Sequence, residues 1–148
     1  MSSLLHTPQQ NGIAERFNRT IKDRVRAMLD DCSLSHCYWP YALTYACHVM
    51  NASPKAGQSD TPHKAFHGTN ADMSFFHPFG CSVWAHVPRE KRDNSFAPRS
   101  RKGYFLGISG PIGSKQNVVL VDKSVFVSSD VSFKNSDDPV DGRVEPSV

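Results

Sequence analysis

A single carboxylate stands among basic residues at helical spacing near the start of the chain. Glu15 is followed by Arg19, Lys22 and Arg26 at steps of three and four residues. At about 100° per residue, these four side chains fall within roughly 60° of one another on a helix, and apolar residues occupy the opposite arc. One acid with three bases on a single face suits the phosphates of a nucleic acid. The alternative interpretation is a solvated charged face, stabilised by Glu–Arg pairing four residues apart.

A second basic stretch runs from Arg89 to Lys102, follows Pro88 and contains Phe96 and Pro98. We expect it to form a long loop between two strands. Exposed loops rich in Lys and Arg can neutralise phosphates without reading sequence, in a salt-sensitive way. A loop that is basic only for solubility is an equal alternative. The aromatic residues near it could stack on bases, but their strand spacing is more typical of a core.

Helices are predicted in the first half of the chain. Apolar residues recur on one face after Asn11, and Asn11 and Gly12 are expected to cap that helix. A second helix is expected to bury Trp39 in its first turn. A short third helix has Thr61 as its cap and Gly68 after its end. The predicted helices span residues 11–30, 39–50 and 62–67.

Strands are predicted from Pro78 onward, where short β-branched and aromatic runs alternate with Gly, Pro and Asp. Asp122 and Lys123 are expected to form a tight turn between two of the strands. Several short strands in about 55 residues predict a small barrel. The predicted strands span residues 82–87, 103–108, 117–121, 124–127 and 131–133. Four large side chains are expected in the interior: Trp84, Phe105, Leu120 and Phe126.

Composition argues against a secreted or membrane-spanning protein. The 148 residues are 39% hydrophobic and 21% charged, which allows one modest core or two small ones. No apolar run approaches the roughly 18 residues of a spanning helix, and the start lacks the features of a signal peptide. The four cysteines show no C-x-x-C spacing. We therefore expect an intracellular protein with reduced thiols and no membrane partner.

The segment HTPQQNGIAERFNRT, from His6 to Thr20, resembles the signature that closes the catalytic core of copia-type retrotransposon integrases. The segments TPHKAFHG, FHPFGCSVWAHVPREKR, RSRKGYFLGIS and VSSDVSF resemble, in order, the polyprotein region between the integrase core and the reverse transcriptase. The resemblance extends to about Lys134. It implies an α+β fold, with N-terminal helices from a truncated RNase H-like core followed by a small SH3-like β-barrel. The implied parts are a helical portion over 1–70, an SH3-like domain over 71–135 and a disordered acidic linker over 136–148.

The same resemblance implies roles for the residues of the polar helix face. The family uses two Asp and one Glu, and the Glu falls on Glu15 as catalytic residue and metal ligand. Asn11, Arg19 and Lys22 would contact DNA, and Arg26 is a further candidate. Strand transfer uses two Mg²⁺ ions roughly 4 Å apart, which a single Glu cannot hold. The two Asp would lie upstream of this sequence, so we expect the complete integrase to use Mg²⁺ and this piece to bind it poorly and to be inactive alone.

The predicted function is that of a retrotransposon integrase fragment whose ancestral role is DNA integration and whose surviving activity is nucleic-acid binding. Its expected partners are element-end DNA, target DNA and other integrase subunits, and it would act in the nucleus. The alternative is a host-recruited protein-interaction module in which the Glu15 helix is vestigial. A reading frame that starts artificially late is a third interpretation.

Overall fold

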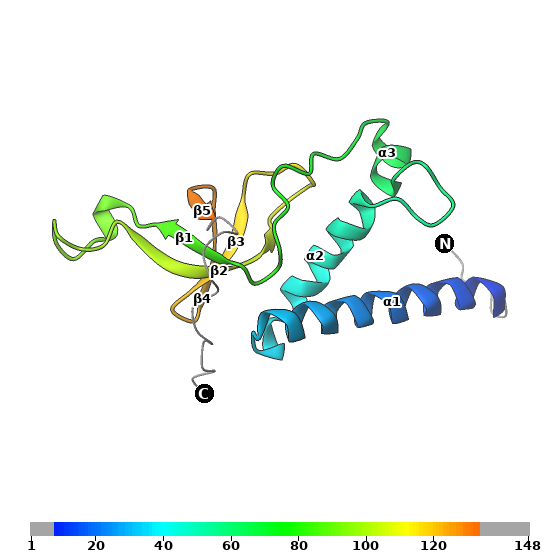
Figure 1. The fold of residues 1–148 in the computed structure, drawn as a ribbon, viewed down its shortest axis with the longest axis horizontal. Helices are drawn as coiled ribbons and strands as arrows, with labels where there is room; N and C mark the ends of the chain where they lie inside the picture. The colour runs from blue at the N-terminus through cyan, green and yellow to red at the C-terminus, as the bar shows by residue number, and fades with distance from the viewer. Residues whose placement is uncertain (1–7, 134–148) are drawn as a thin grey trace, which may run out of the picture.

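The computed structural model describes the backbone of residues 8–133 and the side chains of residues 11–133, so the predicted linker over 136–148 lies outside it. Helices occupy the first half of the described chain and an antiparallel sheet occupies the second, which confirms the α+β fold class (Figure 1). The helical elements are α1 (Pro8–Cys32), the 3₁₀ turn η1 (His36–Tyr38), α2 (Trp39–Ala52) and α3 (Pro62–His67). The sheet region contains β1 (Ser82–His86), the 3₁₀ turn η2 (Arg89–Lys91), β2 (Ser100–Ile108), β3 (Asn117–Val121), β4 (Ser124–Ser128) and β5 (Val131–Phe133).

The ends of the helices follow local chemistry, with one correction. The Thr61 hydroxyl accepts a hydrogen bond from the Lys64 amide at 3.1 Å, and Gly68 adopts a left-handed conformation with φ of 75°, so both predicted ends of α3 are confirmed. The prediction that Asn11 and Gly12 cap the first helix is wrong. Helix α1 already begins at Pro8, and proline suits a first turn because its missing N–H would have no helical partner there.

Five antiparallel strands form one sheet in the order β4-β3-β2-β1-β5. Asp122 and Lys123 join β3 to β4 with φ of 49° and 66°. Two successive positive φ values are typical of the tight hairpin turn whose twist matches that of the strands. The predicted turn is therefore confirmed. The last strand returns to pair with β1, so that Val83 lies opposite Phe133.

The sheet buries one main hydrophobic cluster, and two of the four predicted interior residues belong elsewhere. Phe105 is fully buried and Leu120 is 7% exposed, as predicted. Trp84 is 42% exposed and Phe126 is 40% exposed, so their predicted burial is wrong. Successive strand residues point to opposite faces, and Trp84 stands between the buried Val83 and Ala85. Phe126 lies on β4, a strand at the edge of the sheet.

Helix α2 contacts α1, α3 and β2 and therefore connects the helical half to the sheet. Its residue Tyr45 takes part in this connection. The Tyr45 hydroxyl donates to the His77 carbonyl at 2.6 Å and accepts from the His77 amide at 3.1 Å. Its ring meets Phe105 edge-on at 5.3 Å. A side chain on Gly107, whose φ is 113°, would come within 3.1 Å of Tyr45, so glycine suits this approach. Trp39, predicted to be buried in α2, is 54% exposed instead.

Candidate nucleic-acid interface

The two halves of α1 have different surroundings. In the C-terminal half, Ile21 and Leu29 are buried, and Met28 packs against the main hydrophobic cluster. In the N-terminal half, Ile13 is 65% exposed and Phe17 is 50% exposed. Figure 1 shows why: α1 and α2 converge at the C-terminal end of α1 and diverge toward its N-terminal end. The apolar arc predicted from the sequence is therefore covered only where α2 reaches it.

The face of α1 that packs on the rest of the protein is rotated relative to the predicted apolar arc. Leu29 is among the most buried residues of α1, although helical geometry places it about 80° from Ile21, toward the polar side. Arg24 falls on the predicted apolar arc but is exposed. The buried face therefore directly borders the polar stripe of α1, which consists of Asn11, Glu15, Arg19, Lys22 and Arg26. This packing fixes the direction in which the polar stripe points.

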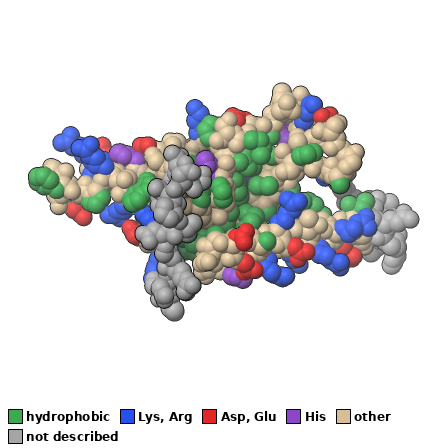
Figure 2. Space-filling model, in the orientation of Figure 1, with side chains coloured by type: hydrophobic (Ala, Val, Ile, Leu, Met, Phe, Trp, Pro, Cys, Tyr) green, Lys and Arg blue, Asp and Glu red, His purple; other side chains and the backbone are tan. Residues whose placement is uncertain are grey.

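All members of the polar stripe are exposed. Arg26 lies 4.0 Å from Asp23, and both side chains remain largely in solvent, so this pair contributes little to stability. Within residues 11–133, no salt bridge involves Glu15, Arg19 or Lys22. Figure 2 shows Lys and Arg side chains along α1 on the visible face. The stripe therefore presents one carboxylate and several cations to solvent.

Glu15 does not form a metal site with the other described residues. No group of three or more His, Cys, Asp or Glu side chains in the described part of the chain could hold a metal ion. A two-metal site for phosphoryl transfer needs several carboxylates around both ions. The described residues alone therefore do not fit the Mg²⁺ pair that the resemblance implies, and Glu15 offers a single ligand.

Comparison with known proteins places the chain in a family. Residues 81–145 match the family model of the retroviral polymerase SH3-like domain. The chain is a relative of retrotransposon Pol polyproteins and carries their SH3-like domain. It is 37% identical over 134 residues, 88% of its length, to the retrovirus-related Pol polyprotein from transposon TNT 1-94 of Nicotiana tabacum. These findings confirm the resemblance to copia-type retrotransposon proteins drawn from the sequence.

Two further relatives agree with this assignment. The Pol polyprotein from transposon RE1 of Arabidopsis thaliana is 28% identical over 90% of the chain. The Ty1-LR3 Gag-Pol polyprotein of Saccharomyces cerevisiae is 36% identical over 65% of the chain. The chain spans 10%, 9% and 5% of the TNT 1-94, RE1 and Ty1-LR3 polyproteins. It therefore corresponds to a small segment of each relative.

The SH3-like domain carries the second basic stretch. Residues 87–99 form the predicted loop between β1 and β2, whereas Arg101 and Lys102 belong to β2 itself. Arg101 donates to the Asp122 carboxylate at 3.3 Å. Trp84, which the sequence interpretation placed in the core, is exposed beside this stretch. Sequence alternation between Val83 and Ala85 is the signal that could have placed Trp84 on the outer face.

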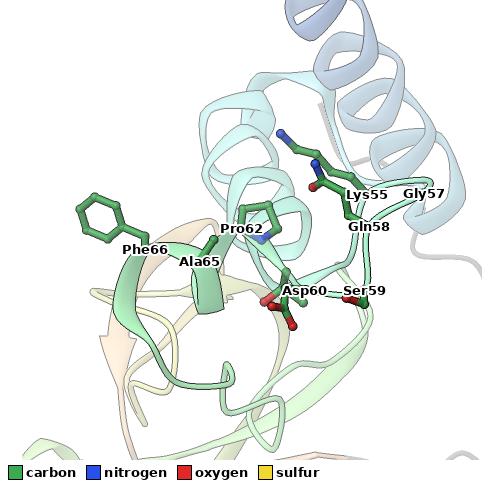
Figure 3. A pocket seen from close by; sticks show the side chains of 9 residues that line it. Lys55, Gly57, Gln58, Ser59, Asp60, Pro62, Ala65 and Phe66 are labelled. Atoms are coloured by element: carbon green, nitrogen blue, oxygen red, sulfur yellow. The ribbon is translucent and has the colours of Figure 1, made fainter.

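One hollow of the described structure is lined by residues of neither basic region. It has a volume of about 710 Å³ and lies between the α2–α3 loop and α3 (Figure 3). Phe66 points away from the other lining side chains and is 85% exposed. Asp60 is paired with Lys64 at 2.7 Å. None of the stripe residues lines this hollow, which has no recognisable catalytic set.

One side-chain pair on α3 was not among the predicted site residues. His63 and His67 stand four residues apart, and their ring centroids are 4.4 Å apart. The spacing alone could have revealed the pair, because residues four apart are neighbours on a helix. Within the described residues no third ligand joins them.

The described helices also include none that is long and apolar enough to cross a membrane.

Proposed function

We propose that this chain is a DNA-contacting segment of a retrotransposon integrase. In it, α1 presents Glu15 toward the reacting DNA. The observation that carries the proposal is the polar stripe of α1. Glu15, Arg19 and Lys22 are exposed side by side on a helix whose opposite end is fixed by buried contacts with α2. The match to retrotransposon Pol polyproteins supports the same role.

Electrostatics supports DNA as the partner of this stripe. Arg19 and Lys22 have no salt-bridge partner among residues 11–133, so contact with phosphates would not require them to break an existing pair. Binding of this kind depends on salt and carries little sequence preference, since phosphate contacts do not read bases. Element ends and target DNA would be bound in this way, and acting on chromosomal DNA would take the protein to the nucleus.

The exposed apolar residues of α1 fit the same proposal. Ile13 and Phe17 are uncovered on the half of α1 that carries Glu15. In a complete integrase, the rest of the catalytic core would pack on this surface and bring the other two carboxylates toward Glu15. Mg²⁺ bound there would stabilise the charge of the transferring phosphate. Contact with further integrase subunits belongs to the same proposal.

The test is a comparison of two double variants that remove the same charge from different faces of α1. Arg19→Ala with Lys22→Ala changes the polar stripe, whereas Arg16→Ala with Arg24→Ala changes exposed arginines that lie away from it. Affinity for a labelled DNA duplex is measured by fluorescence anisotropy at several salt concentrations. We expect the stripe variant to bind about tenfold more weakly at low salt and to show a salt slope smaller by about 2.

The arginine control variant should keep most of the affinity. Equal losses in the two variants would mean that only net charge matters, which would contradict a DNA-facing stripe. Affinity that does not change with salt would also contradict the proposal and favour the protein-interaction alternative.

A further inference from the structure

The outer face of the sheet carries an exposed tryptophan among polar neighbours. Trp84 lies opposite Lys102 on β2 and opposite Ser132 on β5. Paired residues of adjacent antiparallel strands point to the same face, so the indole stands between a cation and a hydroxyl. His86, two residues along β1, is exposed on the same face. This face therefore combines one large aromatic plane with hydrogen-bonding groups.

The loop over 87–99 extends from the same hairpin and presents a second aromatic ring. The Val87 amide donates to the Arg99 carbonyl at 2.8 Å, which pairs the two ends of the loop. At the far end, the Phe96 amide donates to the Asn94 side-chain oxygen at 2.9 Å. Phe96 is 99% exposed. Its ring therefore makes no contribution to the core, although a defined turn holds its backbone.

Basic side chains lie on the same loop and on the strand paired with β1. Four exposed cations lie on the loop and on β2, and none forms a salt bridge with a residue of the described chain. Figure 2 shows Lys and Arg side chains along this arm and a hydrophobic group at its tip. Glu90 and Asp93 are the acidic residues of the loop, so the arm keeps a net positive charge. The four cations are Arg89, Lys91, Arg99 and Lys102.

We propose that the outer face of β1 and β2, together with the loop over 87–99, binds single-stranded nucleic acid. Trp84 and Phe96 would stack on unpaired bases, and the surrounding cations would contact the phosphates. Exposed aromatic planes beside cations match this ligand because every unpaired base offers a face for stacking, whereas a duplex hides its base faces. The polar neighbours of Trp84, among them Ser132 and His86, disfavour a lipid surface, which would be better matched by a continuous apolar patch.

This surface is separate from the α1 stripe of the proposed function, and the ligand form is different. The structure offers a matched control, because Phe126 is as exposed as Trp84 but lies on β4, separated from β1 by β3 and β2. Binding is measured by fluorescence anisotropy with labelled oligo-dT, oligo-U and a DNA duplex. The tested proteins are the full chain and its Trp84→Ala, Trp84→Phe, Phe96→Ala and Phe126→Ala variants.

We expect Trp84→Ala to weaken binding of the single strands about tenfold, because the loss of one stacking plane costs this order of affinity. Phe96→Ala should also weaken it, while Trp84→Phe should restore most of the affinity and Phe126→Ala should leave it unchanged. Duplex binding should respond to Arg19→Ala with Lys22→Ala and not to Trp84→Ala, which separates this proposal from the previous one. The tighter of oligo-dT and oligo-U identifies DNA or RNA as the source of the strand.

Three results would overturn the proposal. The first is an equal effect of Trp84→Ala and Phe126→Ala. The second is a preference for duplex over single strands that Trp84→Ala does not alter. The third is Trp84-dependent binding to phosphatidylserine vesicles without binding to either oligonucleotide.

Discussion

The SH3-like sheet and the N-terminal half of α1 contain similar apolar residues in opposite environments. Phe105 and Val83 are fully buried in the sheet, whereas Ile13 and Phe17 of α1 are at least half exposed. The side chains differ little in chemistry, so the difference comes from the neighbours that each segment finds. The buried residues of the sheet pack against one another and against α2. The first turns of α1 extend beyond the reach of α2. One region is therefore held by internal contacts, and the other presents a surface.

The element that accounts for this difference is α2. Its Tyr45 is bound to His77 of the segment before the sheet, and Ala42 and Ala46 are buried on the same helix. The C-terminal half of α1 shares this core through Met28. The stability of the described chain should therefore depend on the sheet and on the α1–α2 crossing, and little on the half of α1 that carries Glu15.

The largest loss of stability is expected for Phe105→Ala. The ring is fully buried, and its removal leaves a cavity beneath Tyr45, so the free energy of unfolding should fall by about 3–5 kcal/mol. Urea unfolding followed by circular dichroism measures this change. Phe96→Ala is the control, because that ring lies in solvent and its loss should change stability by less than about 0.5 kcal/mol. Comparable losses in the two variants would show that the sheet core is not where the structure places it.

A second comparison divides α1 itself. Ile21→Ala removes a buried side chain of α1 and should lower the free energy of unfolding by about 2–3 kcal/mol. Ile13→Ala makes the same chemical change on the exposed half and should stay within about 0.5 kcal/mol of the parent protein. Thermal or urea unfolding of both variants measures the difference. A large loss from Ile13→Ala would mean that the first turns of α1 are covered after all.

Tyr45→Phe tests the link between α2 and the segment that precedes the sheet. The change keeps the ring but removes a hydroxyl that both donates to and accepts from the His77 backbone. Leaving those partly buried groups without a partner should lower the free energy of unfolding by about 1–2 kcal/mol. Tyr41→Phe is the matched control on the same helix, because no hydrogen bond of the Tyr41 hydroxyl is found among the described residues. Its effect should be small.

The same contact between Tyr45 and His77 should become weaker at alkaline pH. Burial raises the pKa of Tyr45 to about 12 from the ordinary value of 10.0. A group whose pKa is raised on folding favours the folded state below the unfolded pKa, and this stability is lost as the pH rises through the folded value. Unfolding between about pH 10 and 12 should therefore be steeper in the parent chain than in Tyr45→Phe. Identical pH profiles would contradict a buried, hydrogen-bonded hydroxyl.

Local patterns in the sequence predicted the elements better than their packing. Apolar periodicity gave α1 and α2, the Thr61 cap and Gly68 gave both ends of α3, and turn chemistry gave the hairpin at Asp122 and Lys123. These signals are local, since each depends on residues a few positions apart. The resemblance to copia-type proteins, in contrast, was needed to select Glu15, because helical periodicity cannot distinguish a functional stripe from a solvated one.

Burial was predicted less well because it depends on distant partners. The link between Tyr45 and His77 joins residues 32 positions apart, and no local pattern indicates it. Trp39 was expected in the interior from helical spacing, and Trp84 and Phe126 from their places in predicted strands, yet each remains substantially exposed. In a sheet with alternating faces, the presence of an aromatic residue in a strand does not indicate which face will be covered.

The most direct test of the proposed role of α1 is a metal-dependent DNA joining assay on two polypeptides. One is the 148-residue chain, and the other is a longer chain that also contains the two aspartates of the family pattern. We expect no joining by the first with Mg²⁺ or Mn²⁺, because a lone exposed carboxylate beside Arg19 and Lys22 is a poor cation site. In the second, Glu15→Gln should abolish joining and leave most DNA binding intact. Joining by the 148-residue chain that Glu15→Gln removes would contradict this account, as would an active longer chain that is indifferent to Glu15.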